Sequence, residues 1–214
     1  MIVVIFGATG MIGQGALRES LLAADVEEVL AVVRRPTGVR HPKLREVTLA
    51  DFADLTPIED ELRGYDACFY CLGISSVGVG EGAYTRVSYD YPVAAAHTLA
   101  GLDPAMTFVY VSGAGTKPDS RQMWSRVKAR TEIEVIKTFA HGYGFRPGFV
   151  QPTHGATSRT RLYRVIYTLT APLIPVLSRI APKYVTSTDR IGRAMLRAAR
   201  TGLPTRIVEN ADLR

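Results

Sequence analysis

Three glycines close to the amino terminus are spaced so that the backbone could approach a phosphate group. Gly7, Gly10 and Gly13 lie in the segment VVIFGATGMIG, residues 3–13, in which an apolar run leads into a loop and then a helical pattern. Glycines at such a strand–loop–helix junction permit a tight turn, and the helix amino terminus favours a pyrophosphate. The segment therefore predicts a dinucleotide-binding loop, whereas a tight turn without a ligand is the simpler alternative. Its residues are Gly7, Ala8, Thr9, Gly10, Met11, Ile12 and Gly13.

Two consecutive arginines, Arg34 and Arg35, follow the second apolar run of the sequence. Sites for NAD(H) usually carry an aspartate or glutamate here, which binds the 2′-hydroxyl group of the ribose. A guanidinium group instead matches a 2′-phosphate through charge-assisted hydrogen bonds. The sequence therefore predicts NADP(H) as the cofactor in preference to NAD(H). The alternative is that both arginines are merely solvated.

Short apolar runs alternate with helical segments along the whole chain. Strands are expected at residues 2–6, 29–33, 45–49, 67–71, 107–111, 145–150 and 205–208, and helices at 11–23, 90–100, 121–140 and 187–200, with a short helix starting at 56. This order predicts an α/β fold, a Rossmann doubly wound parallel sheet with helices on both faces and a small C-terminal substrate-side subregion. Residues 1–214 are expected to form a single NAD(P)-binding Rossmann domain, with residues 151–186 as a substrate-side or partner-contact insertion.

Further short segments occur at the ends of the expected strands. Asp51-Phe52 follows the third strand, Cys71-Leu72-Gly73 ends the fourth, V-Y-V-S-G at 109–113 ends the fifth, and Arg146-Pro147-Gly148 lies in the sixth. Together with the G-x-x-G-x-x-G loop, these segments resemble the extended and atypical short-chain dehydrogenase/reductases. That superfamily includes NAD(P)-dependent epimerase/dehydratase-like proteins, and the chain is most similar to its NmrA-like members and to the Tat-interacting oxidoreductase-like protein. The resemblance implies that Asp51 and Phe52 lie near the adenine, Cys71, Leu72 and Gly73 near a ribose, and Pro147 and Gly148 beside the nicotinamide.

The superfamily's catalytic motif, Tyr-x-x-x-Lys, falls on the long helix after the fifth strand. Lys128 matches the lysine, which binds the nicotinamide ribose, but the tyrosine position holds Trp124. The resemblance thus implies Ser112, Trp124 and Lys128 as the catalytic set, although a register shift of two residues would put Ala114 at the serine position. An indole N–H donates a hydrogen bond but cannot act as a general acid or base.

Three functions are consistent with this altered motif. The first is an NADP(H)-dependent oxidoreductase whose proton comes from Tyr84, Tyr110, Ser112 or water. The second is a non-catalytic NADPH-binding redox sensor or regulatory protein that acts through a protein partner. The third is another reaction on a nucleotide-linked or isoprenoid-like substrate.

The net charge of +6 and the pI near 9.5 favour anionic partners without selecting one. The basic residues are scattered and form no recognised nucleic-acid motif, so no nucleic acid is expected. No metal is expected either, because the four histidines have no metal-ligand spacing. Only His154 follows the sixth strand on the expected substrate side; the others are His41, His97 and His141. Cys68 and Cys71 lie on one strand with side chains on opposite faces, and are interpreted as two buried thiols.

The segment 159–183 has an apolar centre at 165–177 with basic residues on both sides. Burial or the lining of a substrate pocket is the favoured interpretation, and contact with a partner or a membrane surface is the alternative. No apolar run reaches the roughly 18 residues of a membrane span, and no secretory pattern precedes the first strand. A cytoplasmic location is therefore expected, while the oligomeric state stays open.

Overall fold

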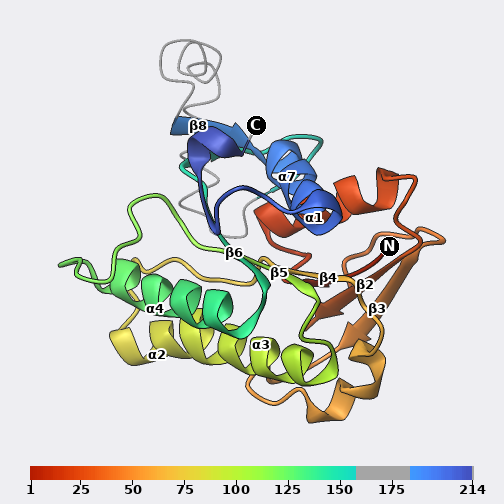
Figure 1. Ribbon diagram of the computed structural model, residues 1–214, viewed down its shortest axis with the longest axis horizontal. Helices are drawn as coiled ribbons and strands as arrows, with labels where there is room; N and C mark the ends of the chain where they lie inside the picture. The colour runs from red at the N-terminus through yellow and green to blue at the C-terminus, as the bar shows by residue number, and fades with distance from the viewer. Residues whose placement is uncertain (158–183, 214) are drawn as a thin grey trace.

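The computed structural model describes residues 1–157 and 184–213, and this part of the chain contains a seven-stranded parallel sheet (Figure 1). The strand order is β3-β2-β1-β4-β5-β6-β9. These strands are β1 (Ile2–Phe6), β2 (Glu28–Val33), β3 (Leu44–Thr48), β4 (Ala67–Tyr70), β5 (Thr107–Val111), β6 (His141–Arg146) and β9 (Ile207–Glu209). Two short strands, β7 (Phe149–Gln151) and β8 (Val185–Ser187), pair with each other in parallel. The order confirms the expected doubly wound Rossmann fold.

Helices cover both faces of the sheet, as Figure 1 shows. Their bounds are α1 (Met11–Leu22), α2 (Glu81–Thr85), α3 (Tyr91–Leu102), α4 (Met123–Thr138) and α7 (Thr188–Thr201). One apolar cluster joins the sheet to α1 and α7, and a second joins its other face to α3 and α4. Successive residues of a strand point to opposite faces, so β1 supplies Val3 and Ile5 to the first cluster and Val4 and Phe6 to the second. Burial on both faces explains why β1 is apolar without alternation.

Glycines bring α1 and α7 into close contact. A Cβ atom added to Gly15 would lie 2.4 Å from the carbonyl oxygen of Thr188, and one added to Gly192 would lie 2.9 Å from that of Gly15. Any side chain at either position would therefore push the two helices apart. This contact holds the amino terminus of α7 beside the helix that follows the glycine loop.

Several expected boundaries differ from the observed ones. The strand expected at 145–150 is wrong in position: β6 begins at His141, ends at Arg146 and is followed by the separate strand β7. Glycines inside β6 obscured it, because Gly142 and Gly144 lie where a Cβ would meet α4, at 2.5 Å from the Val135 carbonyl oxygen and 2.9 Å from the Glu132 Cγ. The short helix expected from residue 56 is a pair of 3₁₀ turns, Thr56–Ile58 and Asp60–Leu62.

The helical segment before α3 was not expected from the sequence. It consists of α2 and a π-helical turn, Arg86–Asp90, which continues directly into α3. Among the described residues, no helix is both long and apolar enough to cross a membrane. The apolar segment 159–183 lies outside the described residues, as does most of the expected insertion 151–186. The single-domain organisation therefore stays a prediction.

Candidate cofactor and active site

The glycine loop joins β1 to α1 through a turn that only glycine fits well. Gly7 has φ +79°, and a Cβ there would lie 2.6 Å from the backbone nitrogen of Leu72 at the end of β4. A Cβ at Gly13 would lie 2.1 Å from the Gly7 carbonyl oxygen. That oxygen also accepts a hydrogen bond of 2.9 Å from the Gly10 amide. The loop is therefore folded tightly against the first turn of α1 and the end of β4.

The amino terminus of α1 is open to an anion. Gly10 is the N-cap residue, so no side chain caps the helix, and the first turn carries no acidic residue. The first amides of a helix lack intrahelical partners and carry partial positive charge. This end of α1 therefore has the properties of a pyrophosphate site.

A cavity of about 100 Å³ lies beside this loop, at the carboxyl ends of the strands. It brings together residues that the sequence analysis assigned to the cofactor from four separate segments. Its lining consists of Gly7, Thr9, Gly10, Val32, Val33, Arg34, Arg35, Phe52, Cys71, Leu72 and Gly73. Of the assigned loop residues, Ala8, Met11, Ile12 and Gly13 do not line it. The remaining residues suit a nucleotide, because the glycines keep the walls thin and the position of a Cβ at Gly73 is open space.

Arg34 and Arg35 are exposed at the rim of this cavity. Neither guanidinium has a hydrogen bond or ion pair to any residue in the part of the chain that the structure describes. The acidic residue of the neighbouring strand, Glu46, instead accepts hydrogen bonds from the backbone and hydroxyl of Thr37, the former at 2.9 Å. Both arginines are thus available to a ligand at the cavity rim.

Asp51 and Phe52 were both expected near the adenine, but only Phe52 lines the cavity. The Phe52 ring is buried and meets Phe6 edge-on, with ring centroids 6.2 Å apart, so it forms part of the cavity wall. The exposed Asp51 carboxylate is not in the lining; it pairs with Arg86 at 3.0 Å. The Ala53 amide, and then Arg86, lower the pKa of Asp51. A direct role of Asp51 in cofactor binding stays a prediction.

The two cysteines point to opposite faces of the sheet, as expected from their spacing. Cys68 belongs to the cluster under α3, and Cys71 packs against the cluster under α1. Burial raises the pKa of both thiols, that of Cys71 to about 12. Both thiols are therefore protonated and unreactive near neutral pH, and Cys71 contributes only shape to the cavity wall.

Trp124 and Lys128 lie one turn apart on α4, over the end of β5. The Lys128 ammonium donates hydrogen bonds to the carbonyl oxygens of Ser112, at 2.6 Å, and Val111, at 3.5 Å. Burial lowers the pKa of Lys128 from 10.5 to about 8. The half-buried Trp124 indole faces the glycine turn after β5: Cβ atoms added to Gly113 and Gly115 would lie 3.8 and 4.0 Å from its ring carbons.

The Ser112 hydroxyl forms a hydrogen bond within the same turn. It lies 2.9 Å from the Thr116 hydroxyl oxygen, and Thr116 in turn donates to the Gly113 carbonyl oxygen at 2.8 Å. Because a hydroxyl carries one proton, Thr116 must accept the hydrogen bond that Ser112 donates. Ser112 is 4% exposed and therefore has no proton directed at a bound substrate.

The tyrosines considered as proton donors are buried. Tyr110 donates to the Ser88 carbonyl oxygen at 3.1 Å, and burial raises its pKa well above the usual range. Tyr84 is 2% exposed. Neither hydroxyl is accessible to a substrate at the end of β5, so the structure does not support either as the donor.

Pro147 and Gly148 are fixed by backbone contacts at the end of β6. The Ala114 amide donates to the Pro147 carbonyl oxygen at 2.9 Å, which ties this segment to the turn after β5. The Gly148 amide donates to the Asn210 side chain at 2.7 Å. Arg146 forms a bidentate ion pair with the buried Glu132, at 2.9 and 2.7 Å, and thereby anchors β6 to α4. Both segments assigned to the nicotinamide end are therefore neighbours in space.

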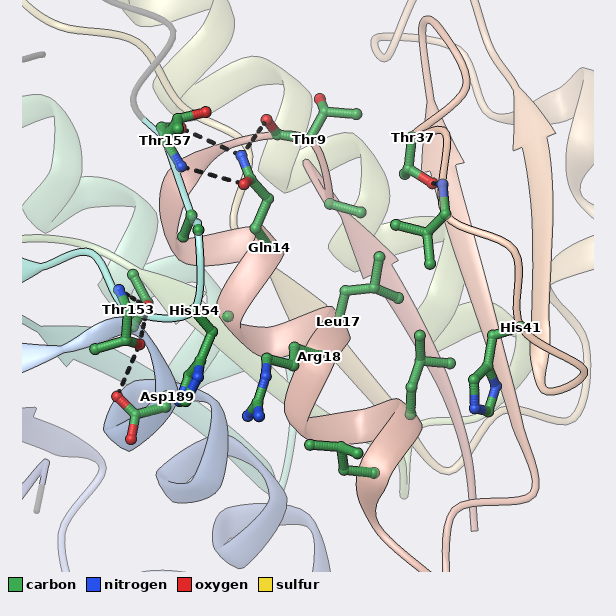
Figure 2. Close-up of a pocket in the computed structure, with 18 residues that line it drawn as sticks. Thr9, Gln14, Leu17, Arg18, Thr37, His41, Thr153, His154, Thr157 and Asp189 are labelled. Carbon is green, nitrogen blue, oxygen red and sulfur yellow. Dashed lines mark hydrogen bonds between the residues drawn. The ribbon is translucent and has the colours of Figure 1, made fainter.

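A second, larger cavity of about 580 Å³ was not expected from the sequence (Figure 2). It lies over the outer face of α1, between Thr37 and His41 on one side and Thr153 and His154 on the other. His154 lines it with a left-handed backbone, φ +52°, and its ring has no hydrogen bond to another described residue. His154 therefore lies in a cavity that shares residues Ala8 and Thr9 with the glycine loop, which is the one respect in which its position matches the expected substrate side.

Gln14 of α1 connects the glycine loop to the segment after β7, and the sequence analysis did not assign it this role. Its side-chain amide donates to the carbonyl oxygens of Thr9, at 3.1 Å, and Thr157, at 3.2 Å, and its oxygen accepts from the Thr157 amide at 3.2 Å (Figure 2). The glycine loop is thus tied to the segment that follows β7. Only its position one turn after Gly10 hinted at this role in the sequence.

Comparisons with known proteins agree with this fold. The model of the NAD dependent epimerase/dehydratase family matches residues 3–138, more than half of the chain. Among solved structures, MoeE5 in complex with UDP-glucose and NAD superposes with a TM-score of 0.72 at 17% identity, covering 97% of this chain and 75% of that one. The Bordetella bronchiseptica enzyme WbmF in complex with NAD⁺ gives 0.71 at 15% identity, covering 99% and 76%. A double mutant of DesIV, a dTDP-glucose 4,6-dehydratase from Streptomyces venezuelae, gives 0.70 at 17% identity, covering 94% and 73%.

Proposed function

The chain belongs to the NAD dependent epimerase/dehydratase family, and we propose that it is an NADP(H)-binding oxidoreductase in which Trp124 replaces the catalytic tyrosine. The observation that carries the proposal is the cavity beside the glycine loop, with Arg34 and Arg35 at its rim. Both guanidinium groups lack partners among the described residues, and an anionic 2′-phosphate would supply one. MoeE5 and WbmF were solved with NAD, so the preference for NADP(H) rests on these two arginines alone.

Each part of the site has a separate task in this proposal. The first amides of α1 bind the pyrophosphate, with Gly7 and Gly13 keeping the loop thin enough for close approach. The Lys128 ammonium, held at the end of β5, binds the nicotinamide ribose. The bound cofactor supplies or accepts a hydride. Trp124 contributes a surface and a hydrogen-bond donor, but no ionisable proton.

The test is the affinity of NADP⁺ and NAD⁺ for Arg34→Ala, Arg35→Ala and the double variant, measured by titration calorimetry. A hydrogen bond to a charged group contributes about 1.5–3 kcal/mol, and exposure to solvent favours the lower end. Each single substitution is therefore expected to weaken NADP⁺ roughly 10-fold and to leave NAD⁺ nearly unchanged. The matched control is Arg40→Ala, an exposed arginine that lines neither cavity. Equal losses for both cofactors, or tighter binding of NAD⁺ by the wild type, would contradict the proposal.

One observation favours a second function. The Ser112 hydroxyl donates its proton to Thr116, and the neighbouring tyrosine position holds a tryptophan. A protein with this arrangement can bind NADPH without turning it over and act as a redox sensor or regulator through a protein partner. Tight binding of NADPH without oxidation, across a panel of carbonyl and quinone acceptors, would favour this second function. Oxidation of NADPH with any of these acceptors at a useful rate would favour the first.

A further inference from the structure

Glu46 lies on β3, beside the strand that ends at the two rim arginines. It is in register with Ala31 of β2, and Arg34 and Arg35 follow directly after the end of β2. Alternation along β3 places Glu46 on the same face as Leu44, which packs against the cluster under α1. A carboxylate so placed is a natural internal counter-charge for one of the arginines.

The Glu46 carboxylate is instead bound by Thr37. Its Oε1 atom accepts hydrogen bonds from the Thr37 backbone amide, at 2.9 Å, and from the Thr37 hydroxyl. The oxygen of this hydroxyl accepts in turn from the Val39 amide at 3.1 Å, so its proton remains for the carboxylate. Thr37 and Glu46 are half-buried, and neither lines the cavity beside the glycine loop. Thr37 therefore acts on Glu46 and not on a ligand in that cavity.

The arginines are within reach of the same carboxylate. Only Pro36 separates Arg35 from Thr37. Two residues of chain span at most about 7 Å, so the backbone nitrogen of Arg35 lies within about 10 Å of the Glu46 Oε1 atom. Arginine and glutamate side chains that turn toward each other can close this distance. The contact with Thr37 thus competes with an ion pair.

Other acidic side chains do not neutralise the arginines in the part of the chain that the structure describes. Asp51, which follows β3, pairs with Arg86 at 3.0 Å. Residues 158–183 lie outside the described structure, but their sequence contains no aspartate or glutamate. Both guanidinium groups therefore keep their charge for a ligand at the cavity rim.

We propose that Thr37 is a specificity-determining positioning residue, which holds Glu46 away from the two arginines and leaves both guanidinium groups for the 2′-phosphate of NADP(H). The inference rests on the proposed NADP(H)-binding function. Sites for NAD(H) use an acidic side chain to bind the 2′-hydroxyl group of this ribose. A Glu46 carboxylate released from Thr37 would disfavour NADP(H) in two ways, because it would pair with an arginine and repel the 2′-phosphate.

The test is a double-mutant cycle of Thr37→Val and Glu46→Gln, with the affinities of NADP⁺ and NAD⁺ measured by titration calorimetry. Thr37→Val removes the hydroxyl and is expected to weaken NADP⁺ about 5-fold, within the roughly 10-fold expected for the loss of one arginine contact. NAD⁺ should bind unchanged or more tightly. Glu46→Gln keeps an acceptor oxygen without the charge and should leave both affinities nearly unchanged. The double variant has no carboxylate to release, so its affinity for NADP⁺ should return to within about 2-fold of the wild type.

Further variants separate this role from damage to the loop. Thr37→Ala also lacks the hydroxyl and gives a second reading of the same change, whereas Thr37→Ser keeps the hydroxyl and should bind both cofactors like the wild type. Thr48→Val is the matched control, because it removes an exposed hydroxyl from the strand of Glu46 at a position that lines neither cavity. Thermal melting of each variant checks that it folds. A loosened loop would weaken both cofactors and would not respond to Glu46→Gln.

The outcomes separate the inference from the proposed function. If the wild type prefers NADP⁺ and Thr37→Val leaves the ratio of the two affinities unchanged, the inference alone is overturned. A loss of NADP⁺ affinity that Glu46→Gln does not restore would also overturn the inference alone. A wild type that binds NAD⁺ as tightly as NADP⁺ would overturn the proposed cofactor preference and the inference with it.

Discussion

Lys128 is expected to make the free energy of unfolding rise with pH. The variant Lys128→Met should lack this contribution. Burial lowers the pKa of Lys128 from 10.5 to about 8. Between these two values the unfolded chain binds more protons than the folded one, so the free energy of unfolding rises with pH. Below pH 8 the lysine is charged in both states, and the full cost of burying its charge is present.

The magnitude follows from the two pKa values. At about 1.4 kcal/mol per pKa unit, the wild type should gain about 2.5 kcal/mol relative to Lys128→Met between pH 7 and pH 10. This value is an upper limit, because part of the side chain remains in contact with solvent. Tyrosines and other lysines that titrate over the same range are present in both proteins, so their effects cancel in the difference.

The assay is urea unfolding of both proteins at pH 7, 8, 9 and 10, followed by circular dichroism. For a urea m-value of about 2–3 kcal/mol/M, the difference between the two unfolding midpoints should change by about 1 M over this range. Lys137→Met is the matched control, because this lysine lies on the same helix but is exposed. A difference between wild type and Lys128→Met that is flat, or that falls as pH rises, would refute the reasoning that burial governs this lysine.

Three further predictions concern the packing around the site. Gly13→Ala should reduce the free energy of unfolding by about 1–3 kcal/mol, because its Cβ would lie 2.1 Å from a backbone oxygen. The loss should appear as a lower melting temperature and as weaker cofactor binding in calorimetry. Gly82→Ala, which meets open space in a helix, is its control, and equal effects of the two would refute this explanation. Glu132→Gln should lower the free energy of unfolding in urea by about 2 kcal/mol, less than the roughly 3–5 kcal/mol of a fully unpaired buried charge, because Arg146 loses its buried counter-charge but keeps its ion pair with the more exposed Glu209. A loss below about 0.5 kcal/mol would show that the pair contributes little. Gln14→Ala should speed hydrogen exchange of the Thr157 amide about 5-fold, the equivalent of one net hydrogen bond of about 1 kcal/mol, and unchanged exchange would contradict the contact.

The sheet could be predicted because its strands are buried on both faces. β1 has Val3, Val4, Ile5 and Phe6 fully buried, and an unbroken apolar run that leads into a glycine loop and a helix is typical of a central parallel strand. The start of β6 could not be predicted in the same way. Gly142 and Gly144 resemble loop residues until α4 is in place, and then the close approach of that helix accounts for both. In a local pattern glycine indicates a turn or loop, whereas inside a strand it can mark a place where another element packs closely.

The clustering of the candidate site was predictable from topology, but its side-chain partners were not. Arg34, Phe52 and Leu72 follow three different strands, and parallel strands bring their carboxyl ends to one edge of the sheet. Which partner each polar group chooses depends on distances that no spacing in the sequence encodes. Asp51 pairs with Arg86, thirty-five positions away, and Gln14 with Thr157, 143 positions away.

In the proposed function, Trp124 and Lys128 have separate parts in proton transfer and in cofactor binding. They lie one turn apart on α4, yet their contacts differ: Lys128 reaches the carbonyl oxygens at the end of β5, and Trp124 faces the glycine turn beyond it. In the proposed function, an indole at the tyrosine position lacks the acid, while the two hydrogen bonds of Lys128 are made to backbone oxygens and not to Trp124. The positive charge of a lysine makes a neighbouring tyrosine more acidic, but it cannot make an indole N–H ionise near neutral pH. In the proposed function, affinity for the cofactor therefore carries no information about turnover, and the two have to be measured separately.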